Sequence, residues 1–156
     1  MSISKKIISF EKLSFLKKLS NKKVLVGGCF DIFHYGHLQF LHKAKEKGDV
    51  LIIALESDQF IKKQKKRKPV HNQIQRAQIL AELYCVDYVL LLPEIKGSSG
   101  YQQLVKDINP NVIAITKGDL QINNKKTQIN SIGGELLIVT AYIDNFSTQQ
   151  IINLLN

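Results

Sequence analysis

The sequence predicts an α/β fold with an open, mostly parallel five-stranded sheet and helices on both faces. Five short apolar runs, rich in leucine or β-branched residues, alternate with polar segments that carry helical patterns. Their continuous hydrophobicity is typical of parallel strands that are buried on both faces. The runs are Val24–Val26, Val50–Leu55, Tyr88–Leu92, Val112–Ile115 and Leu136–Val139.

The segments between these runs predict the crossover helices. Leu38, Leu41 and Ala44 recur at three-residue steps, so we expect a helix from about Gly36 that stops at Gly48. A second helix is predicted by the apolar stripe Ala77, Leu80, Ala81 and Tyr84. A third helix is predicted by Tyr101, Leu104, Val105 and Ile108, and it should end at Asn109-Pro110. A capping-box pattern predicts a last helix after Ser147, with Gln150 at its third position. Lys96–Gly100 and Asn123–Thr127 are expected to be exposed loops.

The first 22 residues are expected to form an amphipathic helix. Phe10, Leu13, Leu16 and Leu19 share one helical face, which would pack on the domain or on a neighbouring subunit. The sequence therefore predicts an N-terminal helical extension over residues 1–22 and one domain over residues 23–156. A homodimer is a natural consequence of such an apolar face.

Composition narrows the class of protein. The chain has 156 residues, of which 44% are hydrophobic and 22% charged, as expected for one globular domain. Its apolar runs are far shorter than the roughly 20 residues of a membrane span, and the N-terminus lacks the apolar core of a secretion signal. We therefore expect a cytoplasmic protein without membrane partners, in which Cys29 and Cys85 are reduced thiols.

The net charge of +9 is concentrated in one segment. Residues 62–68 carry six positive charges within seven residues: Lys62, Lys63, Lys65, Lys66, Arg67 and Lys68. Such a segment predicts an anionic partner, which could be nucleic acid, a nucleoside triphosphate or a sugar phosphate. Charge alone leaves these alternatives open.

The turn after the first run has the features of a phosphate site. A strand that enters Gly27-Gly28 and turns into a helix brings backbone N–H groups and a positive helix end to one place. His34 and His37 are three residues apart there, so both rings can donate to one phosphate chain, and Gly36 allows close backbone approach. The positive helix end also favours neutral imidazoles. A histidine pair alone would suit a structural role or a metal equally well.

The whole string Gly28-Cys-Phe-Asp-Ile-Phe-His-Tyr-Gly-His37 resembles the HxGH signature of the cytidylyltransferase-like nucleotidyltransferase family. The resemblance implies a Rossmann-like fold, two histidines that contact the triphosphate, and nucleotide contacts from Gly28, Cys29, Phe30 and Gly36. The chemistry of this family needs no covalent intermediate, so Cys29 is interpreted as a small turn residue. Asp31 could bind the substrate or orient His37, or it could cap the local turn.

Two further segments resemble parts of the family that bind phosphate groups. The basic segment 62–70 corresponds to a mobile loop whose lysine neutralises the phosphates; Lys65 is the best match, followed by Lys62, and an exposed basic loop is the alternative. Arg76 lies in a helix whose arginine faces the active site in the family. It could hold the acceptor's phosphate, or it could be solvated.

Two more segments resemble the nucleotide-binding parts of the family. Lys117, Gly118 and Asp119 match a KGxD segment at the carboxyl end of the fourth strand, where open α/β sheets bind ligands, although Leu120 departs from the usual tyrosine. Ser147 and Thr148 match a helix start that binds phosphate, while Gln149 replaces the usual third hydroxyl residue.

The resemblance implies that an acceptor phosphate attacks the α-phosphorus of a nucleoside triphosphate and displaces pyrophosphate. Catalysis should then come from alignment and from positive charge, supplied by His34, His37, Lys65 and the helix starts. Mg²⁺ is implied as a cofactor that arrives with the triphosphate, without a set of protein ligands.

Three segments most resemble the adenylyltransferase domain of ADP-heptose synthase: Phe10–Val24, Lys68–Val70 and Gly133–Glu135. They favour ATP and a heptose 1-phosphate, in which case another polypeptide would phosphorylate the heptose. The segment Tyr142–Thr148 lacks the Arg-Thr-Glu-Gly-Ile-Ser-Thr lead-in of cytidylyltransferases, which also favours ATP over CTP.

The alternatives are a CTP-dependent enzyme for glycerol 3-phosphate or another alcohol phosphate, and a non-catalytic nucleotide- or RNA-binding module. Residues 62–68 support the module, and the lack of an aromatic-rich RNA-binding signature argues against it.

Overall fold

A computed structural model describes residues 3–141 and 147–155 of the chain. Its sheet has six strands in the order β1-β4-β3-β2-β5-β6, and every neighbouring pair is parallel. The strands are β1 (Ile7–Ile8), β2 (Lys23–Gly28), β3 (Val50–Leu55), β4 (Tyr88–Leu91), β5 (Val112–Thr116) and β6 (Glu135–Thr140). The α/β prediction is confirmed, and the five expected strands correspond to β2 to β6.

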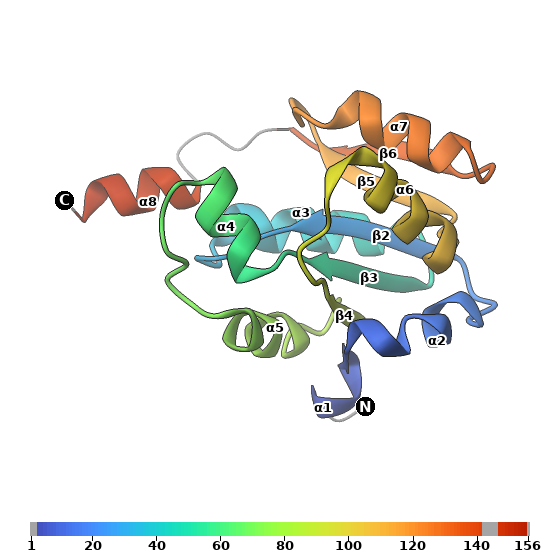
Figure 1. Ribbon diagram of the computed structural model, residues 1–156, viewed down its shortest axis with the longest axis horizontal. Coiled ribbons are helices and arrows are strands. Elements are labelled where there is room, and N and C mark those ends of the chain that lie inside the picture. The colour runs from blue at the N-terminus through green and yellow to red at the C-terminus, as the bar shows by residue number, and fades with distance from the viewer. Residues whose placement is uncertain (1–2, 142–146, 156) are drawn as a thin grey trace.

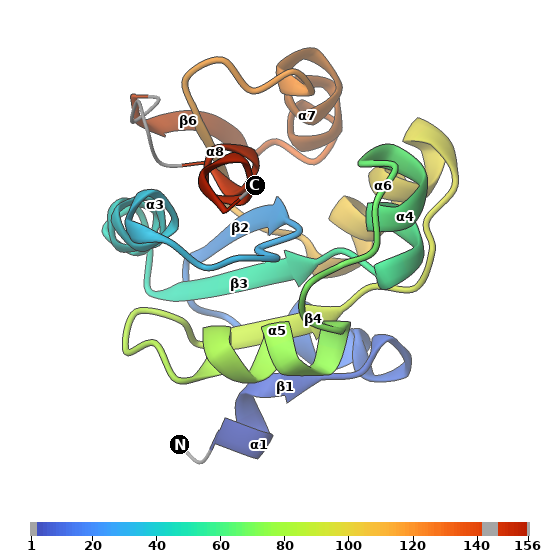
Figure 2. The same ribbon diagram turned by 90° about the vertical axis from the view of Figure 1, so that its left-hand side faces the viewer.

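The helices cover both faces of this sheet (Figure 1). They are α1 (Ile3–Lys6), α2 (Ser14–Lys17), α3 (Tyr35–Lys45), α4 (Asp58–Gln64), α5 (Gln73–Ala81), α6 (Gly97–Ile108), α7 (Ile122–Asn130) and α8 (Thr148–Leu154), with a 3-10 turn η1 (Phe10–Lys12). Figure 2 shows α3 and α6 on opposite sides of β2 and β3. In the described part of the chain, no helix is long and apolar enough to cross a membrane.

The core consists of one apolar layer on each face of the sheet, because side chains alternate along each strand. In β2, Val24 and Val26 face the layer that contains α3 and α5, and Leu25 faces the layer that contains α6 and α7. All three are almost completely buried. The predicted two-sided burial is therefore confirmed for the central strands β2, β3 and β5, but not for the edge strand β6, in which Ile138 is 56% exposed.

The sixth strand comes from the N-terminal segment, which was expected to be one amphipathic helix. That expectation is wrong in detail, because Ile7 and Ile8 pair with Val89 and Leu90 of β4. β-branched residues suit a strand, and their pairing covers an edge that β4 would otherwise expose. Leu13 and Leu16 are buried in the chain's own core, so the homodimer inferred from this apolar face stays a prediction.

A buried lysine fastens this N-terminal segment to the domain. Lys23 at the start of β2 is 3% exposed, and its Nζ donates to the carbonyl oxygens of Leu16 and Lys17 at 3.3 Å and of Ile108 at 2.9 Å. The amine thus satisfies the last carbonyls of α2 and α6 together. Burial lowers the pKa of Lys23, and the nearby Lys17 lowers it further.

Three local expectations were wrong. Tyr84 lies beyond the end of α5 and is 98% exposed, because the chain leaves the helix after Ala81. The expected loop at 96–100 contains the first turn of α6, and the expected loop at 123–127 lies within α7. Glycine, serine and asparagine have weak helix propensity, but the buried stripes that follow them decide the structure. The helix end at Asn109, with φ 51°, is as predicted.

Candidate functional site

A cleft of ≈ 860 Å³ opens at the carboxyl ends of the central strands. Strands β2 and β3 point toward the side of the molecule where α4 and α8 lie (Figure 1). Ten of the expected site residues line this cleft: Gly28, Cys29, Phe30, Asp31, His34, Gly36, His37, Lys65, Ser147 and Thr148. The chain thus brings together segments up to 120 residues apart in the sequence.

The turn between β2 and α3 is tightly packed at Gly28. A Cβ atom built on Gly28 would lie 2.7 Å from the ring of Phe30, a residue whose φ of 48° is in the left-handed region. A larger residue at 28 would therefore displace the ring that lines the cleft. The preference for glycine at this position follows from contact with a neighbouring side chain, in addition to backbone freedom.

His34 and His37 are held side by side at the start of α3. Their rings are stacked, with centroids 3.7 Å apart and planes at 23°. His34 is the N-cap of α3, and its Nδ1 accepts a hydrogen bond from the backbone N–H of His37 at 3.4 Å. Because Nδ1 is an acceptor, the proton of a neutral His34 lies on Nε2. His34 can therefore present an N–H donor to a ligand.

Both histidines are kept neutral in the free protein. Burial lowers the pKa of His34. Burial, together with the adjacent His34, lowers the pKa of His37 to about 3, although the Ile32 carbonyl acts in the opposite direction. The Nδ1 atom of His37 has no hydrogen-bond partner of good geometry among the described residues. Two neutral rings at a positive helix end suit an anionic ligand.

The lowered pKa of His37 predicts that stability falls with acidification. Below about pH 6.5 the imidazole of residue 37 is protonated in the unfolded chain, whereas in the folded chain it stays neutral until about pH 3. The unfolding free energy should therefore decrease as the pH is lowered from about 6.5 to 5, by up to ~1.4 kcal/mol per pH unit from this group. Urea unfolding of the wild type and of His37→Asn at several pH values measures the slope. Equal slopes in the two proteins would contradict the prediction.

The basic segment lies beside the cleft. Lys65 is the C-cap of α4 and lines the cleft, as do Lys63 and Arg67. Lys62 is exposed on α4 and does not line it. The structure therefore brings Lys65 to the histidines, whereas a role for Lys62 would require the segment to move.

Asp31 holds the segment that follows these lysines. Its Oδ1 accepts from the backbone N–H groups of Val70 at 2.9 Å and His71 at 3.2 Å, and its Oδ2 is paired with Arg67. The residue is 2% exposed. Both carboxylate oxygens are thus occupied within the chain, and the substrate-binding role expected for Asp31 stays a prediction. The capping alternative comes nearer, although Asp31 caps a distant segment and not its own turn.

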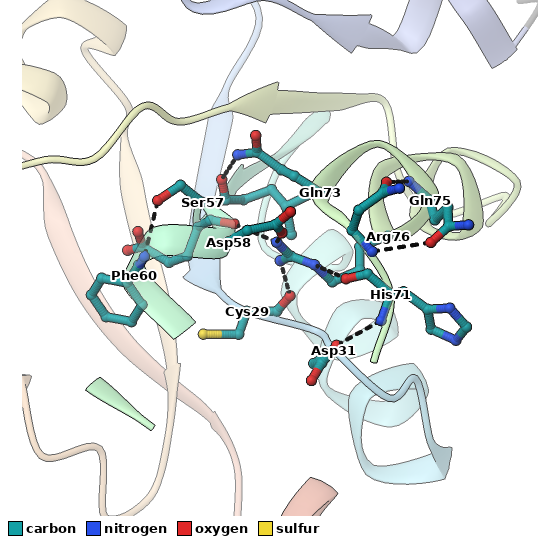
Figure 3. A network of polar contacts seen from close by, with 12 residues as sticks. Cys29, Asp31, Ser57, Asp58, Phe60, His71, Gln73, Gln75 and Arg76 are labelled. Carbon is teal, nitrogen blue, oxygen red and sulfur yellow. Dashed lines mark hydrogen bonds and ion pairs between the residues drawn. The ribbon is translucent and has the colours of Figure 1, made fainter. Parts of the chain in front are cut away.

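Arg76 is also occupied within the chain (Figure 3). Its guanidinium is fully buried and donates to the carbonyl oxygens of Cys29 at 2.6 Å, Glu56 at 2.9 Å and His71 at 3.1 Å. It also forms an ion pair with Asp58 at 2.7 Å. Arg76 thus joins the ends of β2 and β3 to the start of α5, and the expected contact with an acceptor phosphate stays a prediction. Solvation, the alternative, is inconsistent with its burial.

Lys117, Gly118 and Asp119 lie next to the cleft, and none of the three lines it. Asp119 accepts from the backbone N–H of Gln121 and pairs with Lys125 at 2.7 Å. Gly118 has a φ of 83°, which suits glycine. Nucleotide contacts from these three residues stay a prediction; their neighbours on the cleft wall are Thr116, Gln121, Asn124, Lys125 and Gln128.

The last helix begins at the cleft. Ser147 is the N-cap of α8, and its hydroxyl accepts from the backbone N–H of Gln150 at 3.2 Å, as expected. Thr148 and Gln149 also line the cleft. The lead-in segment compared with cytidylyltransferases lies mostly outside the described residues, since positions 142–146 are not described.

Glu56 and Tyr101 are among the polar residues of the cleft wall that sequence reasoning missed. Glu56 directly follows β3 and accepts a hydrogen bond from the Tyr101 hydroxyl at 2.8 Å. A polar residue at the carboxyl end of a predicted central strand was the available signal for Glu56. Tyr101 was assigned only to an apolar helical stripe, where a tyrosine gives no sign of its hydroxyl's partner.

Comparisons with known proteins find a matching family and similar chains. The family model described as cytidylyltransferase-like matches residues 25–152. The bifunctional protein HldE of Campylobacter jejuni strain RM1221 is 36% identical over 158 residues, which cover 97% of this chain and 32% of that protein. The HldE protein of Helicobacter hepaticus is 39% identical, and the match covers 96% of this chain and 30% of that protein. The chain thus spans about a third of the length of these relatives.

Solved structures share the fold. A lipopolysaccharide core biosynthesis protein from Thermoplasma volcanium has a TM-score of 0.62 at 22% identity, with 82% of this chain and 100% of that chain covered. A pantoate-beta-alanine ligase from Francisella tularensis has a TM-score of 0.64 at 18% identity, with coverages of 94% and 76%. At these identities the likeness concerns the fold alone.

Proposed function

Since this chain belongs to the cytidylyltransferase-like family, we propose that it is a nucleotidyltransferase that transfers AMP from ATP to a heptose 1-phosphate and releases pyrophosphate. The observation that carries the proposal is the stacked pair His34 and His37 in the cleft, of which His34 is the N-cap of α3. Lys65 adds a positive charge to the same cleft, and the hydroxyl groups of Ser147 and Thr148 add polar contacts.

The proposed reaction requires no strong general base from the protein. An oxygen of the acceptor phosphate, already ionised at pH 7, forms a bond to the α-phosphorus of the triphosphate. The bond from the α-phosphorus to the oxygen that bridges to the β-phosphorus breaks, and pyrophosphate leaves with that electron pair. Charge shifts toward the leaving oxygens, so fixed donors such as the His34 Nε2–H and the Lys65 ammonium stabilise the transition state more than the ground state.

Mg²⁺ enters the proposal together with the triphosphate. The described residues contain no group of three His, Cys, Asp or Glu side chains arranged to hold a metal ion. This ion commonly binds through phosphate oxygens and retained waters, and a bound Mg²⁺ would neutralise charge on the phosphates. The cationic and neutral hydrogen-bond donors of the cleft suit the phosphate anion with which the metal would arrive.

The choice of ATP and heptose 1-phosphate has two supports. Residues Phe10–Val24, Lys68–Val70 and Gly133–Glu135 resemble the adenylyltransferase domain of ADP-heptose synthase, and relatives named HldE match nearly the whole chain. Because the chain corresponds to a third of those relatives, any second activity of theirs is left out of the proposal.

Pyrophosphate release tests the proposal directly. ATP, CTP, GTP and UTP are each combined with heptose 1-phosphate, glycerol 3-phosphate, phosphocholine and FMN in the presence of Mg²⁺. Activity with ATP and heptose 1-phosphate alone is the expected result. Activity with CTP and an alcohol phosphate would move the substrate assignment to the cytidylyltransferase alternative. Folded protein that binds RNA in a salt-sensitive manner and releases no pyrophosphate would favour the non-catalytic module.

A further inference from the structure

Glu56 carries a carboxylate oxygen that lacks a partner in the wall of the cleft. The residue is 7% exposed and lines the cleft directly after β3. Its Oε1 accepts from the Tyr101 hydroxyl at 2.8 Å. Its Oε2 is buried and has no hydrogen-bond partner among the described residues. A buried carboxylate oxygen is costly unless a donor satisfies it, so a donor is missing from the described residues.

Tyr101 fixes which oxygen of Glu56 is free. Burial raises the pKa of Tyr101, and the Glu56 carboxylate raises it further, so the phenol keeps its proton and donates it to Oε1. Burial also raises the pKa of Glu56, while the Tyr101 hydrogen bond and the nearby Lys125 and Arg76 act in the opposite direction. The terminal torsion of a glutamate side chain is broad, so a rotation about it can bring Oε2 to the cleft.

The position of Glu56 limits which group of a ligand could donate a hydrogen bond to its Oε2. Its backbone N–H donates to the Gly28 carbonyl at 3.0 Å, so it lies beside the turn that leads to the histidines. A carboxylate repels phosphate and accepts from O–H or N–H groups. Its ligand partner is therefore the uncharged, hydroxyl-bearing part of a molecule whose phosphate lies toward the histidines and Lys65.

Glu56 follows β3, which lies on the other side of β2 from β5 and β6. The residues expected to contact the nucleotide follow β2, β5 and β6, apart from Lys65 at the end of α4, which is expected to neutralise the phosphates. The cleft wall also includes residues after β4 and at the start of α6 for which no nucleotide contact is expected, namely Leu92, Glu94, Ile95, Gly97, Ser98 and Tyr101, the last of which contacts Glu56. This part of the wall is available to the second substrate.

We propose that Glu56, oriented by Tyr101, accepts a hydrogen bond from a hydroxyl group of the acceptor sugar and so selects polyhydroxylated phosphates. The inference rests on the proposed function, since it names the part of the acceptor that this cleft recognises. Glu56 would be a specificity-determining residue, and Tyr101 a positioning residue that acts through it.

The test compares steady-state kinetics of the wild type with Glu56→Gln, Glu56→Ala and Tyr101→Phe. Both Glu56 variants should raise the KM for heptose 1-phosphate about tenfold or more, the scale of a lost hydrogen bond to a charged group. The KM for ATP should stay within about twofold, and Tyr101→Phe should have a smaller effect of the same kind. Glu82→Gln, at an exposed glutamate outside the cleft, is the matched control. An unchanged acceptor KM in folded Glu56 variants would overturn the inference.

Failure of the substrate assignment is distinguished from failure of the inference. If the wild type uses another acceptor of the matrix, the same variants are measured with that acceptor. A large effect with glycerol 3-phosphate, which has free hydroxyl groups, would support the inference, and an equal effect with phosphocholine, which has none, would overturn it. If no pair is active, calorimetry measures heptose 1-phosphate binding in the presence of Mg²⁺ and α,β-methylene-ATP. Equal binding by the wild type and Glu56→Gln, or no binding by either, would overturn the inference.

Discussion

His37→Ala is expected to lower kcat at least ~100-fold, the scale for loss of one donor that acts in the transition state. The imidazole lies in the cleft, stacked on His34 and against the ring of Phe30 at 4.9 Å between centroids. Its removal leaves the strands and α3 intact, because the helix cap belongs to His34. Pyrophosphate release at saturating ATP and acceptor measures the loss, and a thermal melt shows that the variant is folded.

His42→Ala is the matched control for this prediction. His42 lies on the same helix, is exposed, and does not line the cleft. Its replacement should leave kcat within about twofold. If folded His37→Ala turns over at the rate of His42→Ala, the histidine pair has no catalytic role, and the proposed mechanism loses its main support.

The regular parts of the fold were predictable because local pattern and burial agree. The strands β2 to β6 are apolar enough to be recognised from sequence, and a two-sided parallel sheet follows from them. The strand β1 was missed because two isoleucines beside lysines carry too little pattern; its pairing depends on the distant Val89 and Leu90. Helix α4 was missed because only Phe60 and Ile61 of its seven residues are apolar, and its last three residues, 62–64, were interpreted as part of a basic loop.

The candidate site was predictable where a motif fixes a local geometry. Gly28, His34 and His37 lie at one turn between β2 and α3, and the family assignment drawn from that turn is confirmed. The contacts of Asp31 and Arg76 within the chain were not predicted, because partners such as Arg67 and Cys29 lie 36 and 47 residues away. A charged residue in a motif suggests a ligand, but whether its charge is satisfied inside the chain is decided by tertiary contacts.

Arg76→Met is expected to lower the free energy of unfolding by at least ~3 kcal/mol. The change removes four hydrogen bonds at once and leaves the carbonyls of Cys29, Glu56 and His71 without this donor, in addition to the Asp58 carboxylate. Each buried acceptor left unsatisfied costs about 1–3 kcal/mol, and methionine conserves much of the volume. Urea unfolding measures the loss, with Lys106→Met on the exposed face of α6 as the control.

Arg76→Lys separates this structural role from substrate binding. Lysine keeps the positive charge but has no planar fork that could serve four acceptors in different directions. If Arg76 acts as the buried connection between β2, β3 and α5, the lysine variant should be destabilised nearly as much as Arg76→Met. If it binds the acceptor's phosphate, both variants should unfold like the wild type, and the lysine variant should retain much of the acceptor affinity that methionine loses. A stable Arg76→Met with a raised acceptor KM would contradict the structural assignment and return Arg76 to the substrate site.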